Sequence, residues 1–201
     1  METTGEVLLG RISKLLYRDG KFYVLDQKSG GVFVFDEKGK HLTSILKKGE
    51  GPGEYIELMD MDVDKAGNVY VFDNARRNIL CYRQADAGDC EVIPVGEHCM
   101  EIGCLDERRF LLRNVFGPDG LKAKLAVWDQ NEQKLDVLVG SKAGEADEMK
   151  VLQVASHAVC RSADKLYYNE RFTPHIYAVD LQGKMHAAIP LLLSDTLLTT
   201  C

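Results

Sequence analysis

The segment of this chain that most suggests chemistry is glycine-rich: Gly49-Glu-Gly-Pro-Gly53. Glycine-rich loops bind phosphate when their amides open a helix and a Gly-Lys-Ser/Thr sequence follows. No such sequence follows here, and the residues after Tyr55 are typical of a strand. We therefore interpret the segment as a structural crossover, in which glycine supplies unusual backbone angles and proline stiffens the turn. Glu54 is expected to accept backbone hydrogen bonds there.

A second candidate is a calcium loop, because Asp60, Asp62 and Asp64 alternate just before Gly67. With Asp62 at the first loop position, Gly67 is the sixth, as an EF-hand requires. However, Ala66 stands where a third oxygen donor is needed, and no glutamate occupies the twelfth position. We favour a polar strand end followed by an aspartate-rich turn.

Nucleophilic catalysis finds no support in the arrangement of histidines and serines. Ser156 and His157 are adjacent in a predicted strand, so their side chains point to opposite faces and cannot form a nucleophile–base pair. No Gly-x-Ser-x-Gly sequence is present. The five histidines are scattered: His41, His98, His157, His175 and His186. The sequence therefore predicts no catalytic residue, no metal ligand and no cofactor.

The elements that would position any functional group recur with a period of 47 residues. Residues 20–26 (GKFYVLD) are matched by residues 67–73 (GNVYVFD), and residues 32–36 (VFVFD) by residues 79–83 (ILCYR). A repeat of this length built from short strands is typical of a β-propeller blade. Such a four-stranded meander cannot bury both faces alone, so its neighbours must cover it.

Continuing the pattern gives about four repeats and predicts one all-β propeller domain over residues 1–201, with an incomplete six-bladed ring as the alternative to a closed one. The predicted blades span residues 10–46, 56–95, 99–140 and 152–190. Asp36, Asp129 and Asp180 align at the end of the third strand, where Arg83 stands in the second repeat. A sandwich or barrel of about sixteen strands is the alternative, which the fixed period disfavours.

The composition excludes several classes of function. A formal net charge of −6 and a pI near 5.4 argue against nucleic acid as a partner. No run of 18 apolar residues predicts a membrane span, and no basic segment followed by an apolar one predicts a signal peptide at the N-terminus. The six cysteines form no Cys-x-x-Cys pair, so we expect free, mostly buried thiols, with a Cys99–Cys104 bridge as the alternative.

Two segments carry a family resemblance. Residues 62–73 followed by 77–82 resemble an NHL-type propeller repeat, and residues 48–55 (KGEGPGEY) resemble the inter-blade segment of six-bladed propeller proteins from Bacteroides-type bacteria. This resemblance implies a propeller fold, six blades, a lipoprotein leader and a periplasmic or cell-surface location. The chain itself shows about four blades and no leader, and a cytoplasmic location stays open.

The connections between the predicted strands differ at the two ends of the blades. One end has uniformly tight polar turns, whereas the other has longer connections, which we call the long-loop face. These connections include residues 47–55, 114–124, 141–150 and 171–174. Irregular loops on a rigid scaffold commonly carry binding sites. The predicted partner-binding residues at that end are Arg113, Asn114, Tyr168, Asn169 and Arg171.

The sequence thus predicts a non-catalytic binding or scaffold module that recognises a protein or glycan through its long-loop face. The alternative is a propeller-type hydrolase or lyase whose site is assembled from several blades on the same face. Blade edges and the apolar residues 191–193 and 197–198 also lead us to expect a homo-oligomer or a strand-swapped closure.

Overall fold

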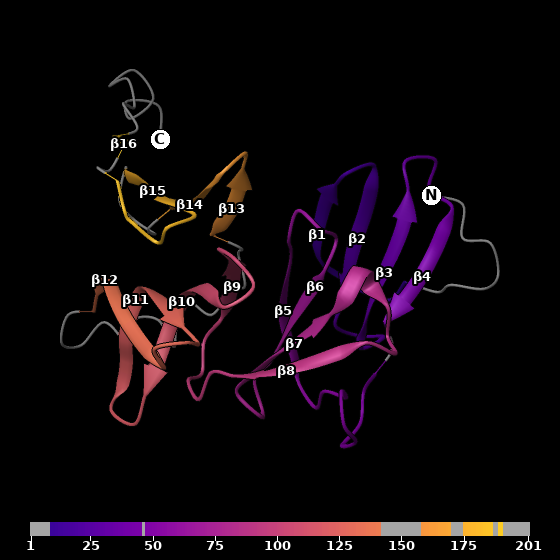
Figure 1. Ribbon diagram of the computed structural model, residues 1–201, viewed down its shortest axis with the longest axis horizontal. Coiled ribbons are helices and arrows are strands. Elements are labelled where there is room, and N and C mark those ends of the chain that lie inside the picture. Colours follow the sequence, from indigo (N-terminus) through magenta and orange to yellow (C-terminus); the bar gives the residue numbers. More distant parts are fainter. Residues whose placement is uncertain (1–8, 46, 142–157, 170–174, 187–188, 191–201) are drawn as a thin grey trace, which may run out of the picture. The chain divides into compact units, whose positions relative to one another are not determined.

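The structure, a computed structural model, describes residues 9–45, 47–141, 158–169, 175–186 and 189–190. These residues form four separate four-stranded antiparallel sheets (Figure 1). The chain divides into two compact units, residues 1–153 and 154–201, so the first three sheets and the fourth are treated separately. The prediction of an all-β chain of propeller blades is confirmed. That the whole chain is one domain remains a prediction.

Each blade is a meander in which consecutive strands pair. Blade 1 contains β1 (Ile12–Arg18), β2 (Lys21–Asp26), β3 (Gly31–Asp36) and β4 (His41–Ile45). Blade 2 contains β5 (Leu58–Val63), β6 (Val69–Asp73), β7 (Asn78–Tyr82) and β8 (Cys90–Pro94), with the 3-10 turn η1 (Arg83–Ala85). Blade 3 contains β9 (Glu101–Cys104), β10 (Arg109–Gly117), β11 (Gly120–Asp129) and β12 (Lys134–Gly140). Blade 4 contains β13 (Val159–Ser162), β14 (Lys165–Asn169), β15 (His175–Asp180) and β16 (Ile189–Pro190).

The aspartates that align at the ends of third strands organise the turns that follow. Asp36 Oδ1 accepts the backbone N–H groups of Lys38 and Lys40 at 2.9 and 2.8 Å. Asp129 and Asp180 accept amides of their own turns in the same way. Aspartate favours turns because its short carboxylate reaches these nearby donors. The recurrence of aspartate at the end of the third strand is therefore explained by the turn that follows it.

Blade 1 packs on blade 2 through apolar residues at alternate positions of the strands. We call the face of a blade that meets the preceding blade its rear face, and the opposite one its forward face. The forward face of blade 1 consists of Tyr23, Leu25, Val32, Val34 and Ile45. The rear face of blade 2 consists of Met61, Val63, Val69, Val71, Leu80 and Tyr82. All are buried in one cluster, and each such large apolar side chain contributes about 1.5–3 kcal/mol.

The same arrangement joins blade 2 to blade 3. The forward face of blade 2 consists of Tyr70, Phe72, Ile79, Cys81 and Ile93. The rear face of blade 3 consists of Ile102, Cys104, Phe110, Leu112, Ala126 and Trp128. The rings of Tyr70 and Phe110 meet edge to face with centroids 5.4 Å apart. The strand register makes the two rear faces equivalent residue by residue.

Two buried aspartates 47 residues apart end the second strands of blades 1 and 2. Asp26 accepts the amide of Arg11 at 2.9 Å, and Asp73 accepts the amides of Ile56 and Glu57 at 3.0 Å each. Both carboxylates thus anchor the chain that enters the first strand of their own blade. The aspartate that makes this anchor is therefore part of the 47-residue repeat in the sequence.

We expect Asp26 to make part of the stability depend on pH. Burial alone would raise the pKa of Asp26, but the amides of Arg11, Ser29 and Gly10 lower it to about 2. A lowered pKa in the folded state adds stability above the unfolded pKa of about 3.9, and this stability is lost as the pH falls through about 2. Unfolding free energies measured between about pH 5 and pH 2 should fall less steeply for Asp26→Asn. An identical slope in the variant would show that Asp26 is not responsible.

One predicted connection is wrong. Residues 114–124 were expected to form a long loop, but β10 and β11 continue through them as a hairpin that pairs Phe116 with Leu121 and Gly117 with Gly120, with a shift of register after Val115. The apolar side chains of Val115 and Leu121 are buried, which extends the sheet beyond the length of the other blades. The predicted connection 141–150 lies outside the described residues apart from Ser141, and the connection 171–174 lies wholly outside them.

The described cysteines are free thiols. They are Cys81, Cys90, Cys99, Cys104 and Cys160. The alternative Cys99–Cys104 bridge is therefore not formed, although both side chains are buried. Cys201 lies outside the described residues.

Candidate functional site

Three charged residues occupy equivalent positions on the first strands of blades 1, 2 and 3. The register places Lys14 opposite Leu25, Asp60 opposite Phe72, and Glu101 opposite Arg113. Lys14, Asp60 and Glu101 are only 8%, 0% and 1% exposed. Charged side chains are almost never this buried unless they are paired. They form what we call the inner-strand charge cluster, together with Asp62 and Arg113.

Ion pairs within and between blades compensate the buried charges of the cluster. Lys14 Nζ lies 3.0 Å from both carboxylate oxygens of Asp60, which joins blade 1 to blade 2. The guanidinium of Arg113 lies 2.6 Å from the Glu101 carboxylate within blade 3. Sequence patterning missed both pairs. The one available signal was Lys14, a charge at a strand position where its neighbours on the same face are apolar.

The alternating aspartates connect blade 2 to blade 3. Asp60 accepts the backbone amide of Ile102 at 2.9 Å, and Asp62 accepts that of Cys104 at 2.7 Å. The strands β5 and β9 belong to different sheets, so side chains replace the missing backbone ladder. Because groups that point to one side of a strand recur every two residues, the carboxylates of Asp60 and Asp62 face the amides of Ile102 and Cys104 in turn. The aspartates are thus engaged in cross-links, and within the described ranges no three His, Cys, Asp or Glu side chains gather as metal ligands.

The electrostatics of the cluster favour a protonated lysine and an unreactive thiol. Burial lowers the pKa of Lys14, but the carboxylates of Asp60, Asp62 and Glu101 together raise it above its ordinary value. Burial raises the pKa of the Cys99 thiol well above its usual range, and Asp60 adds to this. A thiol with a raised pKa is a poor nucleophile at neutral pH.

The predicted partner-binding residues of blade 3 are buried rather than displayed in a loop. Arg113 and Asn114 lie within β10 and are 6% and 5% exposed. The Asn114 amide nitrogen lies 3.5 Å from the sulfur of Met100. Asn114 has a φ of 49° and stands at the position that Asp26 holds in blade 1. Asparagine tolerates this left-handed conformation better than most residues.

In blade 4 the predicted residues separate into one buried and one exposed side chain. Tyr168 is buried on β14 and stacks on Tyr177, with ring centroids 6.0 Å apart. Asn169 is exposed at the end of β14, and its side-chain amide donates to the His175 carbonyl at 3.2 Å. Arg171 lies outside the described residues. Their role in partner binding remains a prediction.

The glycine-rich segment forms the crossover from blade 1 to blade 2. The hydroxyl of Tyr55 is buried and donates to the Gly30 carbonyl at 2.6 Å, and the hydroxyl of Tyr82 donates to the Gly53 carbonyl at 2.9 Å. Arg76 donates to the carbonyls of Glu54 and Glu50 at 2.6 and 2.8 Å. These bonds hold the crossover on both blades.

Backbone conformation favours glycine at one position of this crossover. Gly53 has a φ of +68°, in the left-handed region that residues with a side chain rarely adopt. Glu54 accepts the Gly51 amide at 2.8 Å, as expected from the sequence. The crossover interpretation therefore accounts for the segment without a phosphate.

A pocket of about 250 Å³ lies beneath the crossover, at the long-loop end of blade 2. It is lined by Glu50, Gly51, Pro52, Gly53, Glu54, Asp73, Arg76, Asn78, Leu80 and Val92. We call it the crossover pocket. Polar groups of the crossover and of the β6–β7 turn meet apolar side chains of β7 and β8 there. Val92 is 44% exposed, so an apolar contact surface remains open to a ligand.

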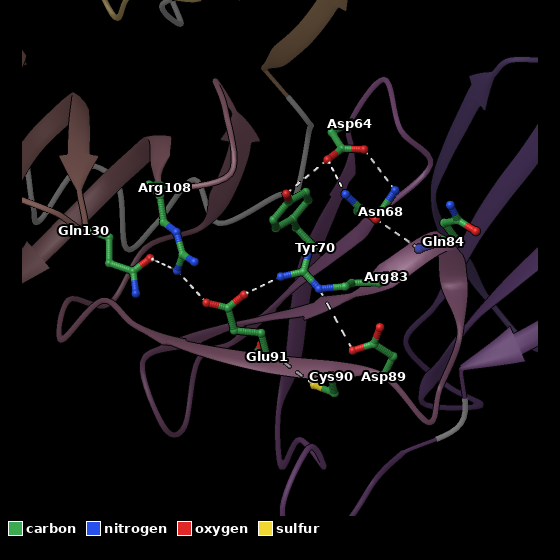
Figure 2. A network of polar contacts seen from close by, with 10 residues as sticks. All are labelled: Asp64, Asn68, Tyr70, Arg83, Gln84, Asp89, Cys90, Glu91, Arg108 and Gln130. Atoms are coloured by element: carbon green, nitrogen blue, oxygen red, sulfur yellow. Dashed lines mark hydrogen bonds and ion pairs between the residues drawn. The ribbon is translucent and has the colours of Figure 1, made fainter.

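The opposite, tight-turn end of blades 2 and 3 carries a network of mutually paired polar groups (Figure 2). Glu91 contacts both Arg83, at 2.9 Å, and Arg108, which in turn donates to Gln130 at 2.9 Å. The two arginines are 43% and 39% exposed, so each pair contributes about 0–1 kcal/mol. This network links neighbouring turns, and its charged side chains form ion pairs with one another.

Comparison with known proteins places the chain in a family. The family described as "Domain of unknown function (DUF4934)" matches residues 1–198. The chain belongs to the DUF4934 family. A search of curated proteins finds no match.

Solved structures similar to this DUF4934 chain share its fold at low sequence identity. A protein of Bacteroides fragilis NCTC 9343 described as a putative exported protein has a TM-score of 0.68 and 18% identity, and the match covers 94% of this chain and 52% of that protein. A DUF4221 member from Bacteroides vulgatus ATCC 8482 has a TM-score of 0.55 and 9% identity, with coverages of 89% and 57%. A streptogramin B lyase has a TM-score of 0.50 and 16% identity, with coverages of 92% and 57%.

These similarities show the propeller fold alone. The chain spans roughly half the length of the similar structures, between 52% and 57%. Within the described residues no helix has the length and apolar character needed to cross a membrane.

Proposed function

We propose that this DUF4934 chain is a non-catalytic binding or scaffold module that recognises a protein or glycan through its long-loop face. The crossover pocket carries this proposal, because it lies on that face and combines polar groups with the exposed Val92. Ligand sites combine apolar walls with a few fixed polar groups in this way. The residues that line the pocket are different from the partner-binding residues that the sequence predicts on the same face.

The state of the charged groups supports binding over catalysis. The charges of the inner-strand charge cluster cross-link blades, and those of the tight-turn end pair with one another. The fold shared with a streptogramin B lyase does not by itself transfer a reaction, because function depends on the site. We further propose a periplasmic or cell-surface location and a six-bladed complete ring, as the family resemblance implies. The likeness to a Bacteroides fragilis protein described as a putative exported protein supports the location.

A binding screen with matched variants tests the proposal. The chain would be presented to a glycan array and to a phage-displayed random peptide library. Val92→Asp places a charge on the open apolar wall of the pocket and should weaken the selected ligands at least about tenfold. The control is Val137→Asp on β12, because Val137 is 49% exposed and does not line the pocket.

The same screen can contradict the proposal. Ligands that bind Val92→Asp and the unaltered chain equally would exclude the crossover pocket. Asn169, which is exposed, and Arg171 would then be replaced by alanine, and an unchanged affinity would also exclude these two predicted residues as a binding site. A screen with no ligand from either library would count against a binding module.

A further inference from the structure

The polar groups of the crossover pocket divide into those that hold the backbone and those that remain unused. Asp73 accepts three backbone amides at 3.0 to 3.2 Å, and Glu54 accepts the Gly51 amide. Arg76 donates two of its five N–H groups to the carbonyls of Glu54 and Glu50. Its other three N–H groups have no acceptor among the described residues, and no carboxylate of those residues forms an ion pair with it.

Two further polar side chains of the pocket are unused. Asn78 begins β7 and lies two residues before Leu80, on the same face of the strand. Asn78 is half-buried, and its side-chain amide makes no hydrogen bond within the described part of the chain. The carboxylate of Glu50 is exposed and has no partner among the same residues. A half-buried amide without a partner gains a hydrogen bond when a ligand supplies one.

The three unused groups differ in what they can bond. The guanidinium of Arg76 only donates, the carboxylate of Glu50 only accepts, and the amide of Asn78 does both. A ligand carboxylate would satisfy Arg76 but meet the like charge of Glu50, and a ligand ammonium group would meet the like charge of Arg76. A hydroxyl group both donates and accepts, so neighbouring hydroxyls on one uncharged ligand match all three groups.

An apolar wall completes the pocket. Val92 pairs with Leu80 in the register of β7 and β8, and Pro52 is exposed on the crossover. All three residues line the pocket. Its volume of about 250 Å³ is below the roughly 300–1,000 Å³ of sites for drug-sized ligands, so the pocket admits one small unit of a larger ligand. A sugar ring has this character, because its C–H face is apolar and its edge carries hydroxyls.

We propose that the crossover pocket binds one neutral sugar residue at the end of a glycan. The sugar hydroxyls bond to Arg76, Asn78 and Glu50, and the C–H face of the ring lies on Val92. Arg76 keeps its two carbonyl bonds, so it presents its remaining donors from a fixed position. The glycan assignment rests on the proposed function, and it selects a glycan rather than a protein as the ligand.

A glycan array with neutral, uronic-acid and amino-sugar termini, read beside the peptide library, tests this assignment. Glycans with a neutral terminal sugar should be selected, and the corresponding free monosaccharide should compete with them. Asn78→Ala, and independently Glu50→Ala, should weaken the selected glycans about tenfold, because each removes a hydrogen bond to a hydroxyl. The control is Glu132→Ala, an exposed carboxylate of blade 3 that does not line the pocket. Circular dichroism checks that each variant is folded.

Ionic strength separates a neutral ligand from a charged one. The affinity for a neutral sugar should be the same in about 50 mM and about 500 mM NaCl, whereas salt screens the attraction of a charged ligand. Selected glycans with a charged terminus, whose affinity falls in the higher salt, would overturn the assignment.

Two other outcomes distinguish the sugar from the pocket itself. Peptides as the only ligands, weakened by Val92→Asp, would overturn the sugar while leaving the proposed function intact. Glycans weakened by Val92→Asp but bound equally by Asn78→Ala, Glu50→Ala and the unaltered chain would overturn the hydroxyl contacts. A screen without any ligand would overturn the sugar together with the proposed function.

Discussion

Replacing Asp60 with alanine is expected to lower the free energy of unfolding by about 3–5 kcal/mol. The carboxylate is fully buried and contacts Lys14 through both oxygens, so its removal leaves the lysine charge in the interior without this partner. The Ile102 amide also loses its acceptor. Denaturant-induced unfolding, followed by circular dichroism, measures the change.

The variant Asp60→Asn serves as the matched control. The asparagine oxygen can still accept the Ile102 amide, while the charge opposite Lys14 is gone. We expect a loss smaller than that of Asp60→Ala. If Asp60→Ala unfolds at the same denaturant concentration as the unaltered chain, the buried ion pair does not stabilise the contact between blades 1 and 2.

Replacing Arg113 with alanine is expected to cost about 3–5 kcal/mol as well. The variant removes the guanidinium that lies 2.6 Å from Glu101, a carboxylate that is only 1% exposed. Thermal and denaturant unfolding of the variant would both shift downward. The loss should be smaller at low pH, where protonation relieves a buried carboxylate that has lost its counter-charge.

Arg113→Lys separates charge from geometry, because lysine keeps the charge but not the planar fork of arginine. We expect its stability to lie between those of Arg113→Ala and the unaltered chain. If Arg113→Ala is as stable as the unaltered chain and yet fails to bind a ligand, Arg113 contacts the partner directly. Binding assays on Arg113 variants therefore need a folding control.

The sequence predicts the blades well because their signals are local. Alternating apolar residues, the turn at residues 18–21 and the third-strand Asp36 all act within a few residues of chain, and the structure shows each of them in the expected place. The glycine-rich crossover is also predictable, since glycine and proline constrain the backbone locally.

The contacts between blades were not predictable from the sequence. Lys14 and Asp60 are 46 residues apart and meet only because neighbouring blades stack in register. The alternation of Asp60 and Asp62 indicates only a polar strand end, because their role as acceptors depends on the amide donors of β9 in the next blade. The hairpin over residues 114–124 was missed because the apolar residues that extend it lie beside glycines typical of a loop. Long-range packing, rather than propensity, decides all three.

The most direct test of a structural role for the inner-strand charge cluster is the double variant Lys14→Met/Asp60→Asn. It removes both charges of the pair together and keeps the acceptor for Ile102. Its unfolding free energy should recover most of the loss seen for Asp60→Ala, and it should bind ligands of the crossover pocket as tightly as the unaltered chain. A stable double variant that no longer binds those ligands would contradict the account, because the buried charges would then belong to the functional site.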